Sequence, residues 1–213
     1  MRMVQKRLGR CAALLVVAGS TLGAFAREAE AQTGRDVYGN NRREIFCLFV
    51  AGPACVHSLS IDGVFAYQGS FNETTRDKDF FRLSAELGYY VRLGRSAMQV
   101  GPAFEAGGAF NDVGDGWFLT PKLRFRMWPG YSPVGIELSP GFVLDTQRDK
   151  VTRVPFQRMG AHGELGVTFF GAFTLFGAGQ WLRSEEGVSA ANAIVGARVL
   201  LPVAVQILAS IKK

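Results

Sequence analysis

The 213-residue sequence predicts an all-β fold, an antiparallel up-and-down β-barrel of eight strands, with ten strands as the alternative. Three observations lead to this prediction. Eight segments alternate between apolar and polar side chains, the pattern of a strand with one apolar and one polar face. No helical pattern of about 10–15 residues separates the segments, which disfavours a parallel α/β sheet. The gaps between the segments alternate between long and short.

The clearest strand covers residues 81–93. Its odd positions, from Phe81 to Leu93, are mostly large and apolar, and its even positions, from Arg82 to Arg92, are charged, small or hydroxylated. This apolar face is longer than an ordinary strand of about five or six residues needs. A strand that crosses lipid on one side and meets a polar interior on the other has this pattern.

Seven further strands share the alternation, the last two more weakly. In chain order they are residues 57–71, 98–110, 117–128, 134–145, 159–170, 172–183 and 190–201. Their apolar faces carry, in the same order, Phe65, Phe104, Leu123, Leu138, Leu165, Leu175 and Val195. Their polar faces carry Asp62, Glu105, Arg124, Glu137, Glu164, Gln180 and Asn192. Pro102, Pro121 and Pro140 fall inside strands, where each removes a backbone donor.

The connections support a barrel that crosses a membrane. The longer gaps are 72–79, 111–116, 146–158 and 184–189, and the shorter ones are 95–97, 129–133 and 171. Transmembrane barrels have long loops on one side and short turns on the other. The alternation also continues over 203–211, after Pro202. This stretch either extends the eighth strand or pairs with residues 45–50 to give ten strands.

The polar faces carry six cations and six anions, which predict a charge network in the lumen. The residues are Asp62, Arg82, Glu86, Arg92, Glu105, Lys122, Arg124, Arg126, Glu137, Asp145, Glu164 and Arg198. Buried charges are tolerated when they are paired and hydrogen-bonded, and eight strands enclose a lumen that side chains can fill. The alternative is that these charges lie on the solvated face of open sheets.

The N-terminus has the features of a secretory signal peptide over residues 1–31. Arg2, Lys6, Arg7 and Arg10 precede an apolar stretch, which is followed by small residues at two cleavage motifs ending at Ala26 and Ala31. We favour cleavage after Ala31, with Ala26 as the alternative. The apolar stretch is shorter than the roughly 20 residues of a spanning helix. The remaining chain then divides into a periplasmic segment, 32–56, and a barrel, 57–213.

The basic charge of the chain belongs partly to this leader. Residues 1–31 hold five basic and two acidic side chains, which reduces the net charge from +6 to +3 for the rest. This value predicts no nucleic-acid partner. Basic residues outside the predicted strands gather in the longest loop, where Arg148, Lys150, Arg153 and Arg158 could contact lipopolysaccharide phosphates. The alternative is an ordinary solvated loop.

Cys47 and Cys55 predict a disulfide in an oxidising compartment, because Gly52-Pro53 between them is a turn signal. The bond would close a short loop, with a contribution of about 2–3 kcal/mol. We expect it to fix the segment that precedes the first strand. No further cysteine lies nearby, so we predict no metal site.

Aromatic residues near segment ends predict girdles at the bilayer interfaces. Phe71, Phe80, Phe81, Phe110, Trp117, Phe118, Trp128 and Trp181 occupy such positions.

The sequence lacks known catalytic and cofactor-binding motifs, so we predict a protein without enzymatic activity and without a cofactor. His162 and Glu164 share one strand face near the predicted outer rim. They could act as a base toward outer-leaflet lipid A, but a suitably placed serine is not identifiable. We therefore expect His162 to be hydrogen-bonded inside a polar lumen.

In these features residues 57–201 resemble the small eight-stranded outer-membrane barrels of Gram-negative bacteria. The resemblance rests on pattern, and the chain ends in Lys213 where such barrels usually end in an aromatic residue. It implies an outer-membrane location, lipid and lipopolysaccharide contacts, and insertion by the barrel assembly machinery. We expect a monomeric, porin-like barrel with a filled lumen and a structural or surface-interaction role. The alternatives are a lipid A-modifying enzyme and a periplasmic ligand-binding barrel.

Overall fold

The computed structural model describes residues 46–48, 55–71, 79–94, 96–111, 114–129, 132–149, 155–184 and 189–202. The predicted signal peptide, residues 1–31, lies outside this part of the chain. So do most of segment 32–56, the basic loop residues Lys150 and Arg153, and the stretch 203–211.

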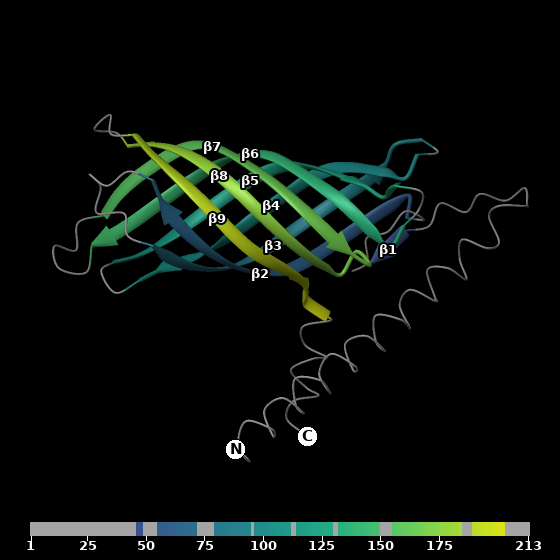
Figure 1. The fold of residues 1–213 in the computed structure, drawn as a ribbon, viewed down its shortest axis with the longest axis horizontal. Helices are drawn as coiled ribbons and strands as arrows, with labels where there is room; N and C mark the ends of the chain where they lie inside the picture. The colour runs from purple at the N-terminus through teal and green to yellow at the C-terminus, as the bar shows by residue number, and fades with distance from the viewer. Residues whose placement is uncertain are drawn as a thin grey trace, which may run out of the picture.

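Eight long strands form a closed antiparallel barrel, as Figure 1 shows. They are β2 (His57–Ser70), β3 (Phe80–Arg92), β4 (Met98–Phe110), β5 (Gly114–Met127), β6 (Val134–Asp149), β7 (Pro155–Phe169), β8 (Phe173–Ser184) and β9 (Ser189–Leu200). Each strand pairs with its neighbour in sequence, and β2 pairs with β9 to close the sheet. The predicted all-β, up-and-down barrel of eight strands is therefore confirmed. No helix in the described ranges is long and apolar enough to cross a membrane.

The connections divide the barrel into two ends. We call the end with the connections β3–β4, β5–β6 and β7–β8 the turn end, and the opposite end the loop end. β5, β6 and β7 extend farther toward the loop end than the sequence predicted. Side chains still alternate between inward and outward there, but the outward ones are polar, so the apolar–polar pattern does not reveal these strand ends. The predicted loop 146–158 is consequently shorter, since β6 ends at Asp149 and β7 begins at Pro155.

The three strand prolines are accommodated by gaps in the pairing of neighbouring strands. Between β5 and β6 the paired residues step from Leu119–Leu144 to Lys122–Gly141 and then to Phe125–Leu138, and so pass over Pro121 and Pro140. Between β3 and β4 they step from Gly88–Ala103 to Val91–Val100, and so pass over Pro102. A closed barrel can therefore contain prolines at positions where the paired residues of two neighbouring strands are interrupted.

A ninth strand, β1 (Phe46–Leu48), pairs in parallel with the start of β2, with Cys47 opposite Ser58. The ten-strand alternative is wrong for this arrangement, because β2 and β9 close the barrel directly. β9 ends at Leu200, and Leu201–Pro202 turn into a short helical segment.

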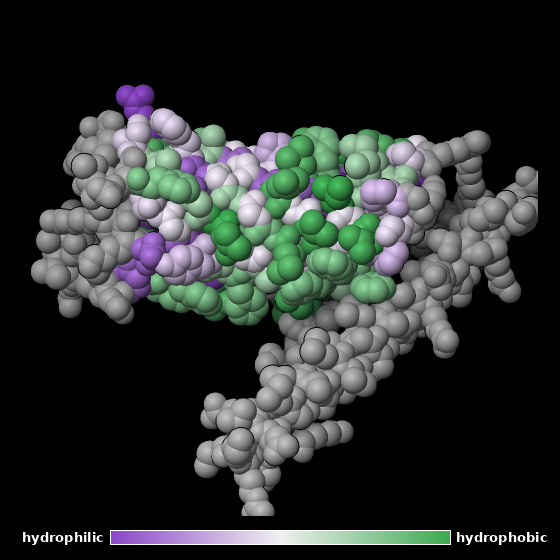
Figure 2. All heavy atoms as spheres, in the orientation of Figure 1, coloured by the Kyte–Doolittle hydropathy of each residue, from purple (hydrophilic) through white to green (hydrophobic). Residues whose placement is uncertain are grey.

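The wall of the barrel has an apolar outer surface. Large side chains that face outward from the strands are substantially exposed, among them Leu165 at 60%, Trp181 at 64% and Val195 at 69%. Figure 2 shows apolar side chains across the middle of the visible wall, with more polar residues toward the loop end. Phe71, Phe81, Phe110 and Trp117 are also exposed.

Three of the aromatic residues expected at the interfaces lie inside the barrel. Phe80, Phe118 and Trp128 are almost completely buried. Phe80 and Phe118 pack with Ala109 in a small apolar cluster, and Trp128 closes against Gly135 near the turn end, where a Cβ on the glycine would lie 2.9 Å from the indole. The expectation that these three residues face the bilayer was wrong, because a position near a strand end does not indicate whether a side chain points outward or inward.

We expect Gly160→Ala to destabilise the barrel and Gly163→Ala, on the same strand, to leave it nearly unchanged. A Cβ at Gly160 would lie 1.7 Å from the carbonyl oxygen of Trp181, whereas nothing lies within 4 Å of a Cβ at Gly163. Overpacking of this kind costs about 1–3 kcal/mol. Urea unfolding followed by circular dichroism measures both variants. Equal stability of the two would contradict the close β7–β8 approach.

Candidate functional site: the charged interior

Eleven of the twelve residues expected to line the lumen are buried, each with less than a tenth of its surface exposed. Arg92, the twelfth, is partly buried near the turn end. The buried residues alternate with exposed apolar ones along each strand, so they project to the interior of the closed sheet. The strands bring together residues that lie far apart in the sequence, since Glu86 on β3 lies 3.4 Å from Arg198 on β9.

Lys122 lies at the centre of the charge cluster. Its ammonium nitrogen is 2.6 Å from a Glu86 oxygen, 2.7 Å from Glu105 and 3.0 Å from Glu164. Glu105 also accepts a hydrogen bond of 2.7 Å from Ser84. A buried ammonium group is stable only when its donors are occupied. Three carboxylates from β3, β4 and β7 occupy the donors of Lys122.

Arg124 and Arg198 bind the same carboxylates from opposite sides of the barrel. Arg124 contacts Glu86 through both terminal nitrogens, one of them at 2.8 Å from Oε2, and lies 3.2 Å from Glu164. Arg198 contacts Glu164 and lies 2.7 Å from Glu137. The planar guanidinium can bridge two acceptors at fixed angles. These arginines therefore connect β3, β5, β6, β7 and β9 through the lumen.

Aromatic rings flank the cluster on both sides. Toward the turn end, the guanidinium of Arg126 lies 4.1 Å from the ring centre of Tyr90 and 2.8 Å from a Glu137 oxygen. Toward the loop end, the guanidinium of Arg82 lies 3.5 Å from the ring centre of Phe118. Such cation–π contacts are favourable where water is excluded. These rings occupy the lumen on the turn-end side and on the loop-end side of the ion pairs.

A second, smaller cluster lies toward the loop end. Arg82 donates hydrogen bonds to Gln68 at 2.9 Å and to Gln180 at 3.3 Å. Arg158 lies 2.6 Å from Asp145 and is 5% exposed. Arg158 therefore does not belong to the basic loop where we expected it, because β7 starts before it and directs it inward. Arg148, from the same group, is exposed on β6.

Sequence reasoning missed Arg158 and the interior aromatic residues Phe80, Phe118 and Trp128. A signal for Arg158 was present, because Arg158, Gly160, His162 and Glu164 continue one alternation without a break. The aromatic residues carried the same signal, because Phe118 and Trp128 alternate with Lys122 and Arg126, and Phe80 with Arg82. An aromatic side chain is compatible with either face of a strand, and we expected these residues at the bilayer interfaces from their position near strand ends.

His162 and Glu164 lie side by side in the interior, but Glu164 is already engaged. The Nε2 atom of His162 is 3.7 Å from Glu164, and its Nδ1 atom is 3.3 Å from the amide nitrogen of Gln180. Glu164 binds Lys122, Arg124 and Arg198 at the same time. A carboxylate held by three cations is a weak base, so the arrangement gives no support to a catalytic pair.

Fold and interior together define the class of protein: a closed eight-stranded antiparallel barrel with paired charges inside and apolar side chains outside. An apolar-ligand carrier has the opposite polarity, with an apolar cavity and a polar outer surface. Among the described residues no group of histidine, cysteine and acidic side chains could hold a metal ion.

No family model and no curated protein matches this chain. Similar solved structures include Ail, the attachment invasion locus protein of Yersinia pestis, with a TM-score of 0.42 and 14% identity over 67% of this chain and 96% of that one. Neisserial surface protein A has a TM-score of 0.42 and 11% identity over 68% and 96%. The N-terminal β-barrel domain of Pseudomonas aeruginosa OprF has a TM-score of 0.35 and 17% identity over 65% and 96%.

We expect Glu164→Gln to lower the free energy of unfolding by about 3–5 kcal/mol, the usual effect of removing one partner from a buried ion-pair network. The double variant Glu164→Gln/Lys122→Met should lose less than the sum of the two single variants, because it removes one charge of each sign. Chemical unfolding measures all three. The exposed Asp115→Asn is the control and should change stability by about 0–1 kcal/mol. Additive losses in the double variant would contradict the network.

Proposed function

We propose that the protein is an integral β-barrel of the Gram-negative outer membrane, without enzymatic activity, and that its role is structural or directed to interactions at the cell surface. The observation that carries this proposal is the inverted polarity of the barrel. Charged residues such as Arg124 and Glu137 are buried, while Leu138 and Phe142, on the same strand as Glu137, are 52% and 42% exposed. Water disfavours such an exterior, and lipid chains match it.

The size of the apolar exterior supports a membrane location over a soluble one. Exposed large hydrophobic side chains occur on all eight strands of the barrel, for example Phe65, Leu83, Phe104, Leu123, Ile136, Leu165, Leu175 and Val195. Monomeric soluble proteins rarely expose contiguous apolar patches larger than a few hundred Å². A band that surrounds the barrel is what a bilayer would cover.

The filled lumen supports a role other than transport of solutes. Ion pairs link five strands across the interior, and rings of Tyr90 and Phe118 stack on arginines next to them. The surface role would then belong to the loop end. There Arg148 is exposed. Together with Lys150 and Arg153, which follow it in the sequence, it is a candidate contact for lipopolysaccharide phosphates. We further propose that the barrel is a monomer inserted by the barrel assembly machinery.

A gel assay and cell fractionation test the membrane location. The mature chain, extracted in detergent from an outer-membrane fraction, should migrate differently in SDS with and without boiling, because a detergent-resistant barrel unfolds only on heating. A protein that remains in the soluble periplasmic fraction without detergent would refute the proposal. An altered lipid A mass spectrum in cells with the protein would refute the non-enzymatic role.

A charge on the outer wall distinguishes lipid from water as the surrounding solvent. Leu138→Arg should lower stability in lipid bilayers by about 2–4 kcal/mol, the effect of an arginine near the middle of a barrel wall. Gln157→Arg, at an exposed position close to the loop end, is the control and should cost about 0–1 kcal/mol. Unfolding in vesicles measures both. Equal effects would indicate that the wall faces water.

Liposomes test the filled lumen. Vesicles that contain the refolded protein should not swell in isosmotic arabinose, because the Lys122 and Arg124 ion pairs cross the lumen. An open porin in the same lipid serves as the positive control. Swelling comparable to that control would contradict a side-chain-filled interior.

A further inference from the structure

The edge of β2 that closes the barrel is covered by two different strands. One edge pairs with β3 from His57 to Gln68. The other edge pairs with β9 from Asp62 to Ser70, and with β1 from His57 to Leu59. Because the first edge is already occupied by β3, β1 and β9 lie on the same edge, one after the other.

β1 takes the place that a longer β9 would have. In the β2–β9 register Asp62 lies opposite Leu200, so residues 203–205 would lie opposite 59–57 if β9 continued. Instead β9 stops, and Pro202, which lacks an amide hydrogen, follows in the short helical segment. β1 therefore covers backbone groups that would otherwise form an open sheet edge, the feature that a closed barrel avoids.

The Cys47–Cys55 disulfide joins β1 to the residues that lead into β2. Cys47 is the central residue of β1, and Cys55 lies two residues before β2. Parallel strands normally need a connection of a dozen or more residues, whereas only residues 49–56 separate β1 from β2 here. The disulfide spans this short return and fixes a pairing that three residues alone would hold weakly.

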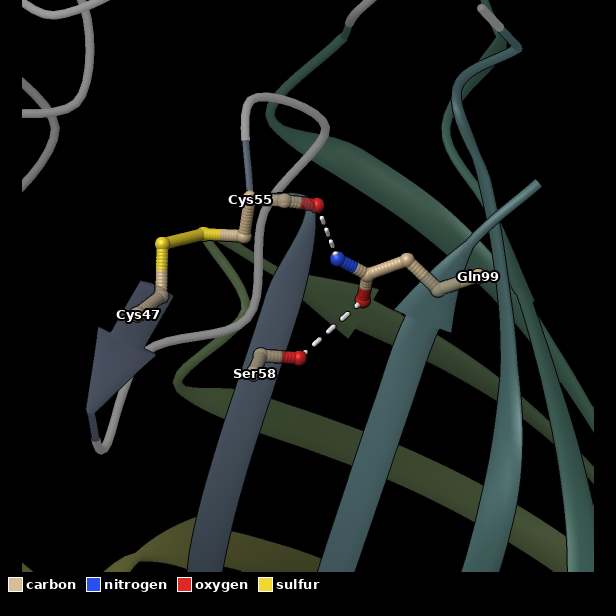
Figure 3. Close-up of a disulfide and its surroundings, with 4 residues drawn as sticks. All are labelled: Cys47, Cys55, Ser58 and Gln99. Carbon is tan, nitrogen blue, oxygen red and sulfur yellow. Dashed lines mark hydrogen bonds between the residues drawn. A yellow bond between two sulfur atoms is a disulfide. The ribbon is translucent and has the colours of Figure 1, made fainter. Parts of the chain in front are cut away.

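Side chains of the barrel anchor the Cys55 end of this segment. Gln99 on β4 donates a hydrogen bond of 2.9 Å to the carbonyl oxygen of Cys55 and accepts one of 3.4 Å from Ser58 on β2, as Figure 3 shows. Gln99 and Ser58 are completely buried, and Cys55 is 4% exposed. The amide of Arg92 adds a bond of 2.8 Å to the carbonyl oxygen of Val56. Cys55 is thus held by the barrel, and Cys47 is held by Cys55.

We propose that this disulfide is a redox-sensitive clip on the barrel seam: oxidised, it keeps β1 on the free edge of β2, and reduced, it releases β1 and uncovers that edge over residues 57–59. A dithiol supplies two electrons and two protons, which convert the bond into the thiols of Cys47 and Cys55 while the dithiol forms its own disulfide. β9 still covers β2 from Asp62 onward, so the opening is local. The proposal concerns the barrel itself and holds in lipid or in detergent.

Hydrogen exchange on the folded wild-type protein tests the clip. The protein is compared oxidised and after reduction with dithiothreitol, with complete reduction verified by the mass of two alkyl groups. We expect amide exchange over 57–59 to rise at least several-fold on reduction, while exchange over 62–70 on the same strand stays unchanged. Unchanged exchange over 57–59, or an equal rise throughout β2, would overturn the proposal.

The variant Cys47→Ser/Cys55→Ser provides the matched control. Without reductant it should exchange over 57–59 like the reduced wild type, and dithiothreitol should have no further effect on it. Slow exchange over 57–59 in the folded variant would also overturn the proposal. If the variant does not fold, reduction of the folded wild type still gives the result, because that measurement starts from the oxidised barrel.

Discussion

Burial of charge inside a narrow barrel is the constraint on which the rest of this structure depends. Lys122, Arg124 and Arg198 share Glu86, Glu137 and Glu164 so that each ion has at least two partners of opposite sign. An unpaired ion in this position would be strongly destabilising, whereas a fully paired network is close to neutral. The network therefore adds little to the free energy of unfolding, but it strongly disfavours any arrangement in which a charge loses its partner. It specifies which strand faces which across the lumen.

The network also needs space, and small residues supply it. A Cβ at Gly141 would lie 2.7 Å from the side chain of Lys122, and a Cβ at Gly196 would lie 2.6 Å from the ring of Phe176. Long charged side chains can therefore cross the lumen where neighbouring strands carry glycine. Because strands alternate, every inward position that carries a charge has outward neighbours, and in the middle of the wall these are mostly apolar. The polar interior and the apolar exterior are two consequences of one alternating pattern.

Closure makes a further demand, because backbone groups on an open strand edge need partners. Here β9 pairs with β2 from Asp62 to Ser70, and β1 pairs with β2 from His57 to Leu59. The strand prolines, which lack a backbone donor, lie where the β3–β4 and β5–β6 pairings skip residues. The position of β1 and of the prolines is therefore explained by the need of backbone N–H and C=O groups for hydrogen-bond partners, more than by side-chain packing.

The sequence by itself determined the strands and their faces, because a period of two reports directly which side chains share a face. Residues 81–93 and 98–110 were predicted within one residue of β3 and β4, and eleven predicted lumen charges are buried in the structure. The tertiary structure alone decided which charges pair, since Arg198 and Glu137 meet only across a closed lumen. It also decided that Arg158 pairs with Asp145, that Trp128 packs against Gly135 near the turn end, and that β1 pairs with the start of β2. These outcomes depend on register and on closure of the sheet, which local periodicity does not encode.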